Sequence, residues 1–226
     1  MTRISVLIPV FNCEKFVGQA IESVFDQTRK VDEIIVVNDG STDSTRSVLE
    51  RFAPDVRIID LPHAGPARAT NAGLAAATGD ILCFLDADDL WTKDKTERQL
   101  KLLLSELSLD AVFGFVRQFQ GNDLIPMNAI LQQASAPQPG ISKITMMIRR
   151  PAFDRIGQFA SALQTADFSE WYMRATEAGI RSRTLDAVVA FRRLHNSNTG
   201  RTRRNEQVKE NLQSLREHLL RRRAQL

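Results

Sequence analysis

The chain has 226 residues, of which 43% are hydrophobic and 25% charged, with 11 glycines, 8 prolines and 2 cysteines. This composition is typical of a globular protein and excludes collagen-like, low-complexity and disulfide-stapled chains. The formal net charge is +3, and the last 26 residues carry eight Lys and Arg against three Glu, so positive charge is concentrated in this tail and the rest is slightly acidic.

No segment has the length or composition of a membrane span. The apolar runs at 6–11 and 81–85 are far shorter than the roughly 20 apolar residues that a spanning helix needs. The N-terminal apolar stretch lacks a cleavage site of small residues, so we expect a first strand there and not a signal peptide. Cys13 and Cys83 form no metal-type pair and are expected to be packing residues. We therefore expect a cytoplasmic protein.

The first 90 residues alternate between strand-like and helix-like segments. Continuous apolar runs predict strands that are buried on both faces of a parallel sheet, at 4–9, 34–37 and 81–85, with a further short strand at 57–61. Apolar spacing and capping residues predict the helices between them, at 16–25, after Asp43 or Ser44, and at 65–78 before Gly79. This order predicts a doubly wound α/β half.

The pattern changes after residue 90. Leucines 100, 103, 104 and 107 predict one amphipathic helix, and residues 121–140 lack periodicity and are expected to be a long binding loop. Strands are predicted at 111–119, 144–148 and 187–192, and a helix at 167–178. A last helix has an apolar stripe of Val208, Leu212, Leu215 and Leu219, which we expect to dock on the body.

These elements predict a single α/β/α domain over 1–200 with a central, mostly parallel mixed sheet. We expect residues 1–90 to form its Rossmann-like nucleotide-binding half, 91–200 its second half, and 201–226 a basic amphipathic helix. The helix is compatible with docking on the body, with a homodimer contact or with a peripheral contact to the inner membrane face. Nucleic acid is not an expected partner, because aromatic residues do not interleave with the basic ones.

Polar residues follow the predicted parallel strands where a ligand site is expected. Asn12, Asp39 and the Asp86-Ala87-Asp88-Asp89 segment come after three different apolar runs, and the carboxyl ends of such strands meet at one crevice. Neighbouring carboxylates repel one another unless a cation is present, and oxygen ligands suit Mg²⁺ or Mn²⁺. Because the chain has no glycine-rich phosphate loop, we expect a metal-bridged diphosphate here.

Four ordered motifs carry a family resemblance. They are Ser5-Val6-Leu7-Ile8-Pro9-Val10-Phe11-Asn12, Val37-Asn38-Asp39-Gly40-Ser41-Thr42-Asp43, Gly65…Arg68…Asn71-Ala72-Gly73 and Gly79-Asp80…Leu85-Asp86-Ala87-Asp88-Asp89. In these motifs the chain resembles a family 2 glycosyltransferase with the GT-A fold. The second half matches more loosely, through Gly157-Gln158-Phe159, the segment 167–174 and Arg193-Leu194-His195-Asn196.

The resemblance implies an inverting sugar transfer from a nucleoside-diphosphate sugar, of UDP or dTDP type, to an acceptor glycan, lipid-linked sugar or peptide. It implies that 91–200 is the acceptor-binding half and that the donor is bound by Pro9, Phe11, Asp39, Arg68 and Asp86. Phe11 is expected to stack on the base, Asp39 to accept a hydrogen bond from it, and Arg68 to face the base or a phosphate. Core packing for Phe11, a turn role for Asp39 and a surface charge for Arg68 are the alternatives.

The resemblance also implies a metal site. Asp88 is the expected main ligand, and His195 is expected to help to hold the metal or the diphosphate, with a plain loop histidine as the alternative. Asp89 is expected to cap a helix before Trp91. His63 and His218 lie in no motif and are expected to face solvent.

The family supplies its general base from an adjacent Glu-Asp pair at the start of a late helix, and this chain departs from that pattern. Asp167 is the only carboxylate near that start, because Phe168 stands beside it. We expect Asp167 to be the base, with a helix cap as the alternative. Glu170 lies four residues before Arg174 and is expected to form an ion pair with it, with the role of general base as the alternative. Trp171, on the same helix, is either a sugar platform or a core residue.

Two other functions remain open on the sequence. The incomplete acidic pair is compatible with a GT-A domain that binds a nucleotide-sugar or a partner without turnover. Nucleotidyl transfer also uses acid-bound metals, but it would need a glycine-rich basic segment after the first strand, where this chain has Asn12-Cys13-Glu14.

Overall fold

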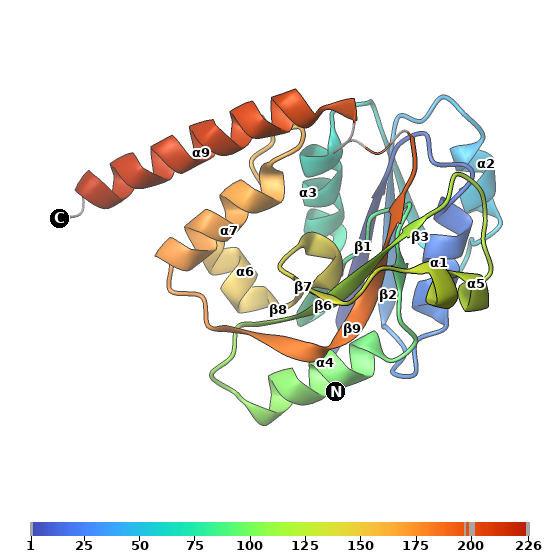
Figure 1. Cartoon of the computed structure of the whole chain (residues 1–226), viewed down its shortest axis with the longest axis horizontal. Coiled ribbons are helices and arrows are strands. Elements are labelled where there is room, and N and C mark those ends of the chain that lie inside the picture. Colours follow the sequence, from blue (N-terminus) through green and yellow to red (C-terminus); the bar gives the residue numbers. More distant parts are fainter. Residues whose placement is uncertain (1, 197, 199–201, 225–226) are drawn as a thin grey trace.

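The computed structural model describes residues 2–196, 198 and 202–224, which form a nine-stranded sheet with helices on both faces (Figure 1). The strand order is β3-β2-β1-β4-β8-β6-β9-β5, and β7 pairs with β6. The strands are β1 (Ile4–Val10), β2 (Glu33–Asp39), β3 (Arg57–Leu61), β4 (Ile81–Phe84), β5 (Leu90–Trp91), β6 (Ala111–Gln120), β7 (Gln138–Gly140), β8 (Met147–Arg149) and β9 (Ser182–Leu194). The α-helices are α1 (Val17–Phe25), α2 (Thr45–Glu50), α3 (Pro66–Ala76), α4 (Lys95–Ser105), α5 (Met127–Gln133), α6 (Arg150–Ile156), α7 (Asp167–Glu177) and α9 (Arg204–Ala224).

Strands β3, β2, β1 and β4 are parallel and covered on both faces, as the apolar runs predicted. Successive residues of β1 point to opposite faces, so Val6 and Ile8 pack with α1, α2 and α4, whereas Leu7 packs with α3, α6 and α7. All three side chains are fully buried. Burial on both faces requires an apolar residue at every position, which explains why these segments read as continuous runs.

The second half of the sheet is mixed. Strand β8 runs antiparallel to both β4 and β6, and β9 lies parallel to β6 over most of its length. The strand predicted at 187–192 is the central part of the longer β9. The strand predicted at 144–148 was wrong in its first half, because Lys143–Thr145 forms a 3₁₀ turn before β8.

The prediction of an irregular loop at 121–140 was also wrong. This segment contains α5 and β7, and Ile130 of α5 is fully buried against Leu90, Phe119 and Phe191. Helix α5 has only seven residues, too few to show a helical period in the sequence. The segment therefore packs against the part of the sheet that β5, β6 and β9 form.

Helix α9 departs from the prediction that its apolar stripe docks on the body. The exposed fractions of Val208, Leu212, Leu215 and Leu219 are 50%, 62%, 45% and 51%. The helix contacts α7 through other, mostly polar residues, and its C-terminal part extends past the body (Figure 1). Among the described helices, none combines the length and the apolar character needed to cross a membrane.

Candidate active site

The carboxyl ends of β1 and β2 bring Phe11 and Asp39 to the same edge of the sheet. The parallel pairing sets Pro9 beside Val37, and Phe11 follows two residues later with an exposed fraction of 43%. Its ring stacks on the imidazole of His63, with a distance of 4.0 Å between the centroids and 24° between the planes. Phe11 is thus an exposed aromatic surface and not a core residue. His63, which lies in no sequence motif and has a side chain that is 51% exposed, is part of the same surface.

The Asp39 carboxylate is 2% exposed and holds the chain before α3. It accepts hydrogen bonds from the amides of Ala64 and Gly65, both at 2.8 Å, and its Oδ2 lies 2.9 Å from His63 Nδ1. Gly40 has a φ of +69°, and a Cβ there would lie 2.7 Å from the His63 amide nitrogen. The segment after β2 can therefore approach His63 this closely only because residue 40 has no side chain. Asp39 therefore holds the segment that carries His63 against the end of β2.

Arg68 lies on the first turn of α3 with an exposed side chain. In the part of the chain that the structure describes, it makes no hydrogen bond or ion pair. Its guanidinium is therefore available to an anionic or planar ligand at this edge.

Burial and neighbouring carboxylates raise the pKa of two aspartates after β4, Asp86 and Asp89. Burial raises the pKa of Asp86, the charge of Lys143 opposes that rise, and Asp88 adds to it. Burial raises the pKa of Asp89 further, and the charges of Asp88 and Asp86 contribute. The amide of Arg193 donates to Asp89 Oδ1 at 2.7 Å. Three carboxylates at one strand end thus form a site with a deficit of positive charge.

Asp89 is not the helix cap that the sequence predicted. Strand β5 follows it directly, and its side chain is 3% exposed and bonded to β9. The reason is that Trp91 is buried in the sheet and is not part of a helix. Through this hydrogen bond, Asp89 links the segment after β4 to β9.

His195 and Asn198 converge on Asp88. His195 Nε2 lies 2.8 Å from Asp88 Oδ2, and Asn198 Nδ2 donates to the same oxygen at 3.1 Å. The His195 side chain is 9% exposed and packs against Phe16 with 5.0 Å between the ring centroids. Thus β4 and the segment after β9 meet at the carboxylate that the sequence singled out as a metal ligand.

This donor set fits a divalent cation. An imidazole nitrogen and a carboxylate oxygen face each other in an acidic surrounding, and Mg²⁺ and Mn²⁺ accept such ligands. Within the described residues, no three His, Cys, Asp or Glu side chains are arranged as a metal cage. A cation held here by Asp88 and His195 would therefore take its other ligands from water and from a diphosphate, as Mg²⁺ sites commonly do.

Arg193 is a site residue whose role the sequence did not reveal. It is fully buried, and its guanidinium carbon lies 4.5 Å from the ring centroid of Phe16 and 4.7 Å from that of Phe119. Its Nε donates to the backbone oxygen of Asp88 at 3.0 Å, and a terminal nitrogen donates to Gln19 Oε1 at 2.6 Å. Arg193 therefore fixes the backbone that carries Asp88. The sequence pattern around Arg193 does not indicate that its side chain is buried.

Asp167, the first residue of α7, pairs with a lysine that the sequence analysis did not single out. Lys143 Nζ donates to Asp167 Oδ2 at 2.7 Å, and the two side chains are 12% and 6% exposed. Burial lowers the pKa of Lys143, but the charges of Asp167 and Asp86 outweigh this effect and raise it. Lys143 thus links the acidic β4 end to the start of α7.

The rest of α7 is structural. Glu170 and Arg174 form the predicted ion pair, with nitrogen–oxygen distances of 2.7 and 3.0 Å. Trp171 is fully buried, stacks on Phe153 and donates to the Gly157 carbonyl at 2.8 Å. Trp171 is therefore a core residue and not a sugar platform.

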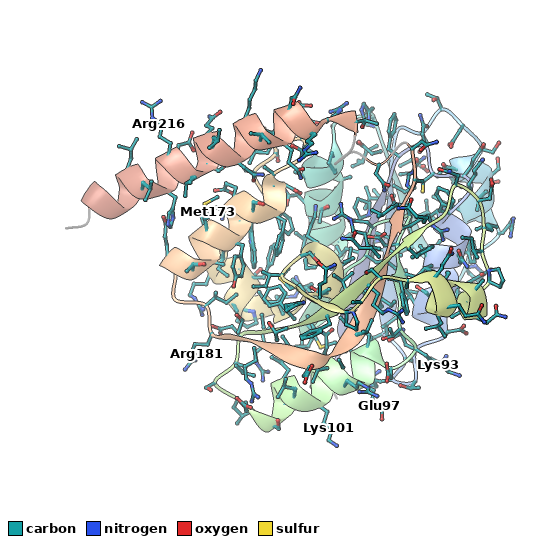
Figure 2. The ribbon with its side chains drawn as sticks, in the orientation of Figure 1. Lys93, Glu97, Lys101, Met173, Arg181 and Arg216 are labelled. Atoms are coloured by element: carbon teal, nitrogen blue, oxygen red, sulfur yellow. The ribbon has the colours of Figure 1, made fainter. Side chains whose placement is uncertain are left out.

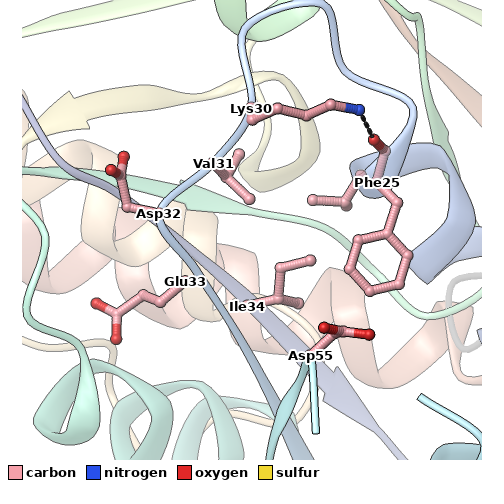
Figure 3. A pocket seen from close by; sticks show the side chains of 8 residues that line it. Phe25, Lys30, Val31, Asp32, Glu33, Ile34 and Asp55 are labelled. Atoms are coloured by element: carbon pink, nitrogen blue, oxygen red, sulfur yellow. Dashed lines mark hydrogen bonds between the residues drawn. The ribbon is translucent and has the colours of Figure 1, made fainter. Parts of the chain in front are cut away.

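A pocket of about 300 Å³ lies elsewhere, between the end of α1 and the start of β2 (Figure 3). Its lining includes Phe25, Lys30, Asp32 and Asp55, and Lys30 donates to the Phe25 carbonyl. The amino ends of the parallel strands lie at the edge opposite to the strand-end aspartates. This pocket is thus separate from the candidate site.

Curated relatives resemble this chain over different lengths. An uncharacterized glycosyltransferase of Nostoc sp. is 37% identical over 62% of this chain and 43% of its own length. A putative teichuronic acid biosynthesis glycosyltransferase of Bacillus subtilis is 27% identical over 86% of this chain and 80% of its own length. The chain spans less than half the length of the uncharacterized relatives from Nostoc and Rickettsia.

Solved structures share the fold. TarS of Staphylococcus aureus in complex with UDP-GlcNAc matches with a TM-score of 0.68 and 22% identity, over 87% of this chain and 60% of its own. The mannosyltransferase PcManGT of Pyrobaculum calidifontis, in complex with GDP-Man and Mn²⁺, matches with a TM-score of 0.68 and 24% identity, over 89% and 60%. These matches confirm the predicted GT-A fold.

The sequence model of the family described as Glycosyl transferase family 2 matches residues 5–167. That range begins in β1 and ends at Asp167, so it covers both the parallel half of the sheet and the start of α7. The chain belongs to glycosyltransferase family 2.

Proposed function

We propose that this chain transfers a sugar from a UDP- or dTDP-type donor to an acceptor hydroxyl, with inversion at the anomeric carbon. The observation that carries the proposal is the Asp88–His195 pair, which lies at the carboxyl end of β4, next in the sheet to the strand that the exposed Phe11 ring follows. Membership of family 2 supports the reaction class. The UDP-GlcNAc in the TarS structure supports a UDP-type donor, and the GDP-Man in the PcManGT structure supports a nucleoside-diphosphate sugar in general.

The donor nucleotide is held at the ends of β1 and β2 and on α3. The exposed Phe11 ring stacks on the base and Pro9 lines its edge. Asp39 accepts a hydrogen bond through the second lone pair of Oδ1, because Gly65 and His63 lie against Oδ2. Arg68 binds base or phosphate, because its donor fork has no partner in the described structure. Asp86 faces the ribose or a metal-bound water.

Asp88 and His195 would hold a divalent cation, Mn²⁺ or Mg²⁺. The chemistry it would supply is neutralisation of charge on the leaving diphosphate, worth several kcal/mol. Arg193 keeps the Asp88 backbone in place from its site between two aromatic rings.

Asp167 takes the proton of the acceptor hydroxyl. As the hydroxyl oxygen forms its bond to the anomeric carbon, the bond from that carbon to the diphosphate oxygen breaks, and the nucleoside diphosphate leaves with the electron pair. Attack from the face opposite to the diphosphate inverts the anomeric centre. Lys143 holds Asp167 Oδ2, and the carboxylate keeps lone pairs for the acceptor proton. The acceptor, a glycan, lipid-linked sugar or peptide, is placed along residues 121–140 and α7.

The test is the release of nucleoside diphosphate from a panel of sugar nucleotides with Mn²⁺. We expect one donor to be turned over, the Asp88→Asn variant to be inactive, and Asp167→Asn to lower kcat by about 10²- to 10⁴-fold, the contribution of a general base. Calorimetry should show that Asp167→Asn still binds the donor. Undiminished turnover in Asp167→Asn would remove Asp167 from the mechanism.

A second candidate function is binding of a nucleotide-sugar without turnover. Phe168 in place of a second acid and the Lys143–Asp167 pair favour it, because the start of α7 offers one carboxylate and Lys143 already occupies one of its oxygens. Donor binding with no release of nucleoside diphosphate, for all donors and acceptors in the panel, would support this candidate over the transferase.

A further inference from the structure

One face of α9 is anchored to the body of the protein. Glu210 accepts hydrogen bonds from the amides of Gln164, Thr165 and Ala166, at 2.9, 2.9 and 3.0 Å. One turn later, Ser214 is 3% exposed. His218 lies against the carboxylate of Glu177 on α7, and its side chain is 14% exposed, contrary to the expectation that it faces solvent. We call the side of α9 that carries Glu210, Ser214 and His218 the anchored face.

A second face of α9 carries the apolar stripe, defined as Val208, Leu212, Leu215 and Leu219. Their spacing of four, three and four residues keeps them on one side of the helix, each between 45% and 62% exposed. At 100° per residue, the stripe lies about 130° around the axis from the anchored face. The body therefore leaves the stripe uncovered in the described structure.

The acidic residues of α9 lie on the side of the helix opposite to the stripe. At 100° per residue, Lys209 and Arg216 lie beside it on the side away from the body, whereas the three glutamates of the helix lie about 160–200° from Val208. Figure 2 shows Arg216 projecting away from the body on α9. The exposed face combines leucines with cations and excludes acids.

This combination points to the nature of the partner. Two copies of the face packed together would bring like charges close, which is unfavourable. A surface that is both apolar and anionic matches both features, because leucines enter the boundary of the acyl chains while lysine and arginine pair with headgroups. At 1.5 Å per residue, the helix has room to lie along such a surface over about 30 Å.

We propose that the apolar stripe of α9, together with Lys209 and Arg216, docks the protein on an anionic lipid surface. The helix lies in the plane of the surface and does not cross it. This inference does not depend on the proposed reaction, because it rests on the exposure and the charge of α9 alone.

The experiment is cosedimentation of the full chain with phosphatidylcholine vesicles, with and without phosphatidylglycerol. We expect binding to the anionic vesicles only, weakened by salt. Lys209→Gln with Arg216→Gln should lower affinity about fivefold per cation, the equivalent of about 1 kcal/mol each. Leu212→Ala with Leu215→Ala should lower it about tenfold or more, because each removes methylene groups from the acyl boundary.

Matched controls lie on the body. Lys93→Gln with Lys101→Gln removes the same charge from the distant α4 edge (Figure 2), and Leu107→Ala removes a leucine that is 82% exposed. Both controls should bind like the parent chain. Failure to bind anionic vesicles, or equal loss in controls and α9 variants, would overturn the proposal. A concentration-dependent dimer that the leucine variant abolishes, without vesicle binding, would overturn it in favour of a second copy.

Discussion

Each aspartate at the sheet edge owes its role to its immediate partners. Asp39 is held by two amides, Asp88 by an imidazole and an amide side chain, and Asp89 by the amide of Arg193. Asp167 alone pairs with an ammonium group, that of Lys143. In the proposed mechanism, residues of one type thus serve as a base-reading acceptor, a metal ligand, a brace and a general base, because their burial and their neighbours differ.

The Lys143–Asp167 pair is buried, so its two members should be coupled in stability. Lys143→Met should lower the free energy of unfolding by about 3–5 kcal/mol, because it leaves the carboxylate without a partner. In that background, Asp167→Asn should restore part of the loss. Urea unfolding of the two single variants and the double variant measures the coupling. Additive effects of the two substitutions would contradict a direct interaction.

Lys95 predicts a dependence of stability on pH. Burial lowers the pKa of its ammonium group from 10.5 to about 8, with the charge of Cys83 opposing the shift. Between these two values the unfolded chain holds the proton and the folded chain has lost it, so stability rises with pH in that window. Relative to Lys95→Met, the parent chain should gain about 3 kcal/mol between pH 7 and pH 10.5.

Urea unfolding of parent and variant at several pH values from 7 to 10.5 measures this gain. The control is Lys101→Met, because Lys101 is exposed on the same helix. Its difference from the parent chain should not change with pH. A constant difference for Lys95→Met as well would show that the buried ammonium group keeps its ordinary pKa.

Among the secondary-structure elements, α9 and the start of α7 are joined by one carboxylate. Burial opposes ionisation of Glu210, but the amides of residues 164–166 outweigh it and lower its pKa. These residues directly precede Asp167, so α9 supports the loop that presents the proposed base. The contribution of Glu210 to stability is present above its unfolded pKa and is lost as the pH falls through the lower folded value.

Glu210→Gln should therefore loosen this loop. A neutral amide accepts weaker hydrogen bonds than a carboxylate, by about 1–2 kcal/mol in total, so amide exchange at residues 164–166 should become about tenfold faster. Glu217→Gln, elsewhere on α9, is the control and should leave that exchange unchanged. Hydrogen exchange followed by mass spectrometry measures both. Unchanged protection in Glu210→Gln would mean that the loop is held by other contacts.

In the whole molecule, the donor should bind to the folded chain only, because its proposed contacts come from β1, β2, α3 and the β4 end together. UDP with Mn²⁺ at about 100 times Kd should stabilise the fold by about 2.7 kcal/mol, a rise in melting temperature of about 5–10 °C. EDTA should abolish most of the shift, as should Asp88→Asn. An equal shift with and without metal would contradict the cation-bridged diphosphate.

The sequence by itself determined the parallel half of the fold and the positions of the strand-end aspartates. Doubly buried strands need continuous apolar runs, and parallel strands put the residues that follow them at one edge, so local pattern was sufficient there. It also determined the ion pair of Glu170 and Arg174, because one helical turn sets its geometry.

Only the tertiary structure decided which partners these residues meet. Lys143 reaches Asp167 across 24 residues of sequence and Arg193 reaches the Asp88 backbone across 105, distances over which periodicity carries no information. The same holds for Trp171, buried by α6, and for the apolar stripe of α9, left exposed because polar contacts orient the helix. A hydrophobic pattern shows that a face is apolar, but the packing of distant elements decides what covers it.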